Sequence, residues 1–127
     1  MRLDHANWYE VESYIRKCPG IFLPTGSIEQ HGPMGLIGTD SFCAQDIADT
    51  AAEKLDILSA PAVCYSPSPF NMSFPGTISV SIESFIEVVA EIALSLKKHG
   101  FKLIYIVNAH GANLEPLFSI KKKIKGI

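Results

Sequence analysis

The residues with the clearest chemical potential lie in the loop GSIEQHGPMGLIGTD, residues 26–40. Its five glycines and prolines exclude a helix or strand throughout, yet the loop carries Glu29, His31 and Asp40. In an extended segment residues i and i+2 share a face, so Glu29 and His31 are expected to point to one side. A second histidine, His110, lies in the stretch NAHGAN near the C-terminus. Two imidazoles and two carboxylates are a ligand set suited to Zn²⁺, Mn²⁺ or Fe²⁺.

The residue types leave a second interpretation open. His31 and His110 can be polar loop residues without a ligand, and Asp40 can act as the cap of a helix that begins beside it. Spacing alone does not separate a metal site from this structural role.

Apolar patterns on either side of these loops predict an alternation of helices and strands. Four stretches have helical spacing and three are short apolar runs: helices over 7–17, 41–56, 81–99 and 113–124, and strands over 20–24, 57–66 and 101–107. In the second helix the apolar residues stand at 42, 43, 47, 51 and 55.

This order predicts an α/β fold with a parallel β-sheet sandwiched between helices, as a single domain over residues 1–127. Right-handed crossovers place the C-terminal ends of all the strands at one edge, where such folds bind ligands. The loops at 24–40 and 108–113 both follow strands directly, so we expect them to meet there.

Composition argues against several classes of partner and location. A formal net charge of −2 and a pI near 6.0 do not suggest binding to nucleic acid or to an anionic membrane. The N-terminus is too polar for a signal peptide, and no apolar run approaches the length of a membrane span. Cys18, Cys43 and Cys64 show no C-x-x-C spacing, so we expect small buried thiols in a reducing cytoplasm.

Three motifs, in order along the chain, resemble those of the creatininase family. LPTGSIEQHGPMGLIGTD, at 23–40, is similar to the family's first signature, which contains E-Q-H-G-P-H-L-P-L and ends in T-D. FPGTISV, at 74–80, matches its F-P-G-T loop, and IVNAHGAN, at 106–113, is similar to its N-G/A-H-G-G-N signature. The resemblance covers nearly the whole chain.

The resemblance implies a metal-dependent amidohydrolase that cleaves the C–N bond of a cyclic amide or a formamide with metal-activated water. Carried over residue by residue, the ligands of the divalent ion, with Zn²⁺ foremost and Mn²⁺ or Fe²⁺ as alternatives, fall on Glu29, His31, Asp40 and His110. Asp40 would bridge two ions where two bind.

The same resemblance suggests the surroundings of the ion and the partners of the chain. Phe74 and Thr77 would line the mouth of the pocket, while Asn108 and Asn113 would either meet the substrate or brace the turn at His110. The expected partners are a small-molecule amide and further copies of the chain, since the family forms ring-like hexamers.

The sequence departs from the family pattern inside these motifs. Residues 34–37 replace the usual H-L-P-L, which removes an imidazole beside the site. Phe70 and Asn71 stand where the family often has Glu-His, so we expect a substrate contact to be lost. Creatininase has a metal-binding glutamate where this chain has Ala112, and Glu115 would need an unusual turn to replace it.

The sequence ends at Ile127, where the family usually continues for roughly as long again. The segment that would follow includes an H-A-G-E motif with a further glutamate ligand and a catalytic histidine. We therefore expect a shortened form, one product of a split gene, or a degenerate relative. Two functions follow: an amidohydrolase, or a catalytically impaired metal-binding subunit or fragment that acts through association. A nucleotide binder is disfavoured, because no G-x-G-x-x-G or G-K-S/T motif follows a strand.

Overall fold

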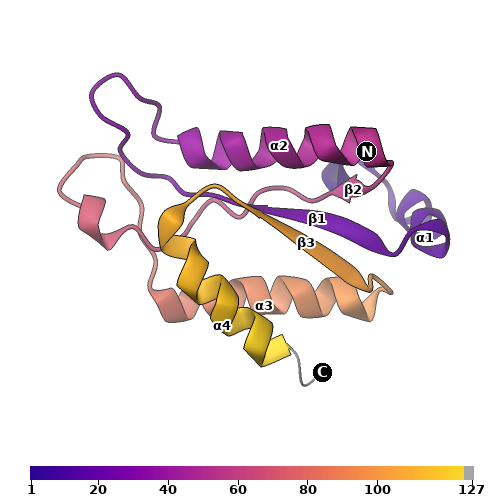
Figure 1. The fold of residues 1–127 in the computed structure, drawn as a ribbon. Coiled ribbons are helices and arrows are strands. Elements are labelled where there is room, and N and C mark those ends of the chain that lie inside the picture. The colour runs from indigo at the N-terminus through magenta and orange to yellow at the C-terminus, as the bar shows by residue number, and fades with distance from the viewer. Residues whose placement is uncertain (125–127) are drawn as a thin grey trace.

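The computed structural model describes residues 1–124, apart from the side chain of Lys123. A parallel three-stranded sheet in the order β2-β1-β3 is built from β1 (Gly20–Thr25), β2 (Leu58–Ser59) and β3 (Leu103–Asn108). One long helix covers one face of this sheet and two cover the other (Figure 1): α2 (Thr39–Leu55) against α3 (Ile82–Lys98) and α4 (Leu114–Ile124). The predicted α/β fold with a parallel sheet between helices is confirmed.

The first helix, α1 (Trp8–Lys17), lies at the opposite end of the sheet from the loops that follow β1 and β3 (Figure 1). A capping box between Asn7 and Glu10 starts this helix. Val11 and Ile15 of α1 are partly buried against the core, whereas Trp8, which has helical spacing with them, is 65% exposed and stacks on Tyr9.

The register of β1 and β3 places the ends of the two strands side by side. Thr25 pairs with Asn108, its hydroxyl donates to the Asn108 side-chain oxygen at 3.0 Å, and the Ala109 amide donates to the Thr25 carbonyl at 3.0 Å. The loops after β1 and β3 therefore leave from the same edge of the sheet, as expected. The predicted strand over 57–66 is reduced to two residues, although beyond it the Val63 amide still donates to the Pro24 carbonyl at 3.0 Å.

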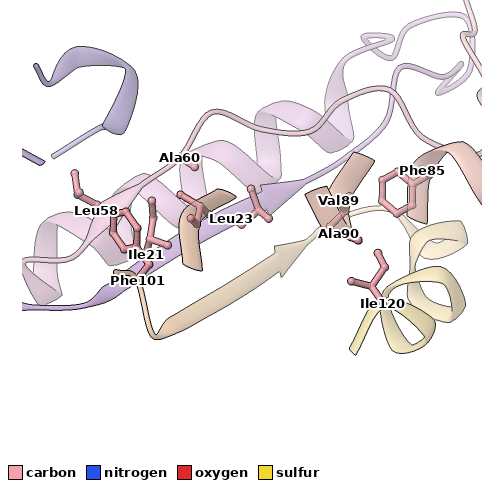
Figure 2. Packing of buried hydrophobic residues seen from close by; sticks show 10 residues of the cluster. Ile21, Leu23, Leu58, Ala60, Phe85, Val89, Ala90, Phe101 and Ile120 are labelled. Carbon is pink, nitrogen blue, oxygen red and sulfur yellow. The ribbon is translucent and has the colours of Figure 1, made fainter. Parts of the chain in front are cut away.

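The main hydrophobic core lies between the sheet and the helices α3 and α4. Figure 2 shows Ile21 and Leu23 of β1 among side chains from α3, α4 and the turn before β3. Burial of this apolar surface is the main favourable contribution to folding.

The helix α2 buries a different face from the one its apolar residues suggest. Its buried residues are Ser41, Ala44, Ala48 and Ala52, whereas Phe42, Ile47 and Leu55 are 56%, 58% and 62% exposed. At the first turn of α2 the reason is the close approach of the helix to the end of β1, because a Cβ at Gly26 would lie 2.5 Å from the Ser41 backbone.

The expectation of buried cysteines is wrong, whereas the structure bears on the absence of a membrane span as follows. None of the three cysteines is buried: Cys43 is exposed, and Cys18 and Cys64 are partly exposed. Within residues 1–124, no helix is both long and apolar enough to cross a membrane.

Candidate metal centre

Backbone contacts on two sides hold the loop after β1 in a defined shape. The Glu29 amide donates to the Ile37 carbonyl at 3.0 Å, and the Ile78 amide donates to the Ile28 carbonyl at 2.9 Å. Gly35 folds back so closely that a Cβ there would lie 2.1 Å from the His31 carbonyl oxygen. The irregular loop thus needs glycine where it closes on His31.

Asp40, in the first turn of α2, joins the two histidines. Its Oδ1 lies 3.0 Å from Nε2 of His31, and its Oδ2 lies 2.9 Å from Nδ1 of His110. The Ser27 hydroxyl also donates to Oδ2, at 2.8 Å. The carboxylate does not cap α2, whose N-cap is Gly38 without a side-chain hydrogen bond, so the capping role considered for Asp40 is wrong.

Glu29 completes the group. Its Oε1 lies 3.2 Å from Nδ1 of His110, and both side chains are largely buried. One ligand atom each from Glu29, His31 and Asp40 lie within 4.8 Å of one another. The four residues singled out by the sequence therefore lie together at the C-terminal edge of the sheet.

The hydrogen bonds of the two imidazoles to backbone carbonyls determine which ring nitrogen carries the proton. Nδ1 of His31 lies 3.0 Å from the Glu29 carbonyl, and Nε2 of His110 lies 2.9 Å from the Pro67 carbonyl. A carbonyl oxygen only accepts, so each of these nitrogens carries a proton. In the neutral imidazoles, the other nitrogen then presents a lone pair to Asp40.

This arrangement calls for positive charge between the lone pairs and the carboxylates. Two neutral imidazoles and two carboxylates carry a formal charge of −2, which a divalent cation would neutralise. A second hydrogen bond from the far imidazole nitrogen to a carbonyl is also typical of histidine ligands. The donor set fits a Zn²⁺-type ion.

In the absence of a metal ion, protonation of His31 supplies part of this positive charge. The pKa of His31 is raised above 6.5, first by its hydrogen bond to the Glu29 carbonyl and further by Asp40, while desolvation acts in the opposite direction. The imidazole of His31 is therefore a site where protons and cations compete.

The amide side chains predicted near the site support the backbone. Nδ2 of Asn108 donates to the His110 carbonyl at 2.8 Å, and Nδ2 of Asn113 donates to the Gly26 carbonyl at 3.0 Å. Asn113 has no exposed surface. These contacts favour the bracing role over a substrate contact.

The residues expected at the pocket mouth differ from each other. Thr77 is buried, and its hydroxyl accepts a hydrogen bond from the backbone amide of Gln30 at 3.1 Å. Phe74 is 50% exposed. Thr77 therefore holds the loop that carries Glu29 and His31, while Phe74 is open to solvent.

Several residues that contact the four were not predicted to do so. They are Ser27, Pro67, Ser68 and Asn71. Ser27 lies inside the first motif, and its position two residues before Glu29 was the available signal. Pro67 acts through its backbone carbonyl, which no sequence pattern reveals.

Comparison with known proteins agrees with the motifs. The creatininase (creatinine amidohydrolase) family model matches residues 4–126. A mycofactocin precursor peptide peptidase of Mycolicibacterium smegmatis is 34% identical over 105 residues, which cover 78% of this chain and 42% of the peptidase. A 3-dehydro-scyllo-inosose hydrolase of Thermotoga maritima is 28% identical over 117 residues, which cover 91% of this chain and 38% of the hydrolase.

Solved creatininases share the fold. A creatinine amidohydrolase crystal structure superposes with a TM-score of 0.89 at 23% identity, over 99% of this chain and 53% of the other. Others, at 24% identity and TM-scores of 0.87 to 0.89, include a manganese form, a zinc–zinc form of a mutant and a mutant complexed with creatine. The chain thus spans about half the length, or less, of the proteins that it matches.

We expect Gly26→Ala to displace the first turn of α2 and weaken the contacts of Asp40. A Cβ at Gly26 would lie 2.5 Å from both Cα and N of Ser41, so backbone must move against backbone. Overpacking of this kind typically costs about 1–3 kcal/mol, measurable by urea unfolding. Gly111→Ala is the matched control, since nothing lies within 4 Å of its Cβ position. Equal stability of the two variants would contradict this account.

We also expect the stability of the metal-free protein to depend on the contacts of the protonated His31 with the Glu29 carbonyl and with Asp40. Because the folded pKa of His31 is raised above 6.5, this contribution is fully present below about pH 6.5 and is lost as the pH rises through the folded pKa. Urea unfolding of chelator-treated protein between about pH 5.5 and 8.5 should show that His31→Gln destabilises most at the lowest pH. A cost that does not change with pH would refute this contribution of the protonated His31.

Proposed function

This chain belongs to the creatininase family, and we propose that it forms the metal-binding part of an amidohydrolase that cleaves the C–N bond of a cyclic amide or a formamide. The observation that carries the proposal is the arrangement of the two histidines around Asp40. The far nitrogen of each imidazole is held by a backbone carbonyl, and the near nitrogen is aimed at one oxygen of the same carboxylate.

The proposed ligands of the ion are Glu29, His31, Asp40 and His110. Mixed nitrogen and oxygen donors suit Zn²⁺ best, with Mn²⁺ or Fe²⁺ as alternatives, and solved creatininases include zinc and manganese forms. Because Asp40 offers a separate oxygen to each imidazole, the site suits one ion or two bridged by this carboxylate. A bound ion would supply Lewis acidity, which polarises an amide carbonyl and makes water a stronger acid.

For the substrate, we propose only the type of bond that is cleaved, the C–N bond of a cyclic amide or a formamide. The relatives include a peptide peptidase, an inosose hydrolase and a creatininase complexed with creatine. A small-molecule amide is consistent with the creatininases, and the exposed Phe74 ring would lie at the mouth of its site.

An alternative function is a metal-binding subunit of low intrinsic activity that acts through association. One observation favours it: within residues 1–124, the hydrogen bonds and ion pairs of the four proposed ligands involve no other titratable side chain. A general acid or base typically accelerates such a reaction about 10²–10⁴-fold. The described residues do not place such a group beside the ligands.

The two functions are separated by metal binding and hydrolysis measured on the same protein. We expect the chain to bind Zn²⁺ or Mn²⁺ and to hydrolyse creatinine and formamides slowly, and we expect His31→Ala to abolish tight binding and any turnover. His5→Ala, at an exposed histidine far along the chain from the loop, is the control. Turnover near one per second, on the order of an ordinary enzyme, would establish the hydrolase and refute the low-activity subunit. Full metal binding by His31→Ala would refute the proposed ligand set.

Self-association is a further part of the proposal, and the outer edge of β3 is the surface that we assign to it. In the described sheet β3 is an edge strand, and Leu103, Tyr105 and Ile106 are 52%, 42% and 40% exposed. No charge or proline interrupts the strand from Leu103 to Val107, although such residues usually protect edge strands from pairing.

An apolar groove of 910 Å³ adjoins this edge. It is lined mainly by residues of β3, α3 and α4, including Ile104, Ile106, Leu114, Leu117 and Phe118. We assign it to a second copy of the chain, because an edge strand can pair with its own copy about a two-fold axis. Three such pairs would make the hexamer that the family resemblance implies.

We expect sedimentation equilibrium to find dimers or larger assemblies at micromolar concentration, and Ile106→Lys to convert them to monomers. The lysine would place a charge on the paired edge and in the groove. Ile47→Lys is the control, because Ile47 is 58% exposed on α2, on the other face of the sheet. A monomeric wild-type protein would overturn the proposal, and dissociation by Ile47→Lys alone would move the interface to α2.

A further inference from the structure

A chain of three hydrogen bonds leads from a backbone amide to the carboxylate of Glu29. The Gly32 amide donates to Oε1 of Gln30 at 2.8 Å. Nε2 of Gln30 then donates to Oδ1 of Asn71 at 2.9 Å, and Nδ2 of Asn71 donates to Oε2 of Glu29 at 2.7 Å. The three bonds connect the loop after β1 with a segment about forty residues later.

The direction of this chain is determined at its start. A backbone N–H can only donate, so the oxygen of Gln30 must face Gly32 and its NH₂ group must face Asn71. The oxygen of Asn71 is then occupied, and its NH₂ group must face Glu29. Each amide has one orientation that satisfies all of its neighbours, and that orientation presents a donor to the carboxylate.

The consequence for Glu29 is that its two oxygens are not equivalent. Asn71 occupies Oε2, while Oε1 lies 3.2 Å from Nδ1 of His110. Glu29 is only 8% exposed, so water has little access to compete for Oε2. The carboxylate is held in one orientation with a single oxygen directed at the proposed ligands.

The segment that carries Asn71 also contacts His110. The Pro67 carbonyl and the Ser68 hydroxyl lie 2.9 Å and 3.3 Å from Nε2 of His110. The Phe70 ring lies beside the imidazole, with 6.4 Å between centroids and 26° between the ring planes. One short segment thus orients both Glu29 and His110.

We infer that Asn71, oriented by Gln30, is a positioning residue that directs one oxygen of Glu29 at the ion. The inference rests on the proposed function, because it assigns Asn71 a role toward the same metal site. It adds a role to this part of the chain, where the sequence suggested the loss of a substrate contact. Partners of this kind typically change metal affinity about 10- to 100-fold when they are removed.

The test uses substitutions of similar shape that carry no charge. We expect Asn71→Leu to lower the affinity for Co²⁺, measured by calorimetry, about 10- to 100-fold and to change the visible absorption of the bound Co²⁺. Gln30→Met should shift both in the same direction by less. Gln45→Met is the matched control, since Gln45 bonds to Asp49 and to the Ala60 and Ala62 backbone instead. It should lower stability without changing the Co²⁺ spectrum.

A double-mutant cycle with Glu29→Gln decides whether Asn71 acts through Glu29. If it does, Asn71→Leu should cause no further loss of Co²⁺ affinity in the Glu29→Gln background. An equal loss in both backgrounds, or an unchanged affinity and spectrum for Asn71→Leu, overturns the inference alone. A wild-type chain that binds neither Co²⁺ nor Zn²⁺ overturns the proposed function and this inference with it.

Discussion

The carboxylate of Asp40, shared between two imidazoles, is the interaction on which the site depends. The three residues come from three places: the start of α2, the loop after β1 and the turn after β3. They can meet only if α2 begins directly against the end of β1. Ser27 secures this, because its hydroxyl donates to Asp40 while its carbonyl accepts from the Ser41 hydroxyl at 2.8 Å. The geometry of the site thus follows from one close contact between a strand end and a helix start.

That contact explains why the two faces of the sheet are packed differently. Large side chains such as Phe85 of α3 and Ile120 of α4 fill the space between these helices and the sheet. Burial of their apolar surface contributes most to the free energy of folding on this face. Under α2 the buried residues are alanine and serine, which let the helix approach closely but bury less apolar surface. One face therefore contributes most of the stability, and the other sets the distance between the carboxylate and the histidines.

The strand β3 links the proposed site with the proposed interface. Its outer edge is unpaired in the described sheet, and two residues after its end comes His110. Any polypeptide that paired with this edge would lie close to the site. In the proposed self-association, that polypeptide is a second copy of the chain.

Much of the architecture could be predicted from the sequence. The alternation of helices and strands, the parallel sheet and the meeting of the two loops followed from apolar periodicity and from the rules of parallel crossovers. The meeting of Glu29, His31, Asp40 and His110 followed from donor types and from the resemblance to the creatininase motifs. These are local or topological properties, which residue type and chain order specify directly.

Other features depended on contacts between distant segments. Periodicity suggested that Phe42, Ile47 and Leu55 of α2 face the core, but α2 buries its serine and alanine face instead, so these side chains are exposed. Asp40 has the type and position of a helix cap, yet two histidines from other segments occupy its oxygens. Asn71 lies outside the metal motif and reaches Glu29 only in the folded chain. The sequence by itself determined which elements form and which donors are available, because both are set by residue type and order. The tertiary structure alone decided which face is buried and which hydrogen bonds orient each donor, because these depend on packing distances between segments far apart in the chain.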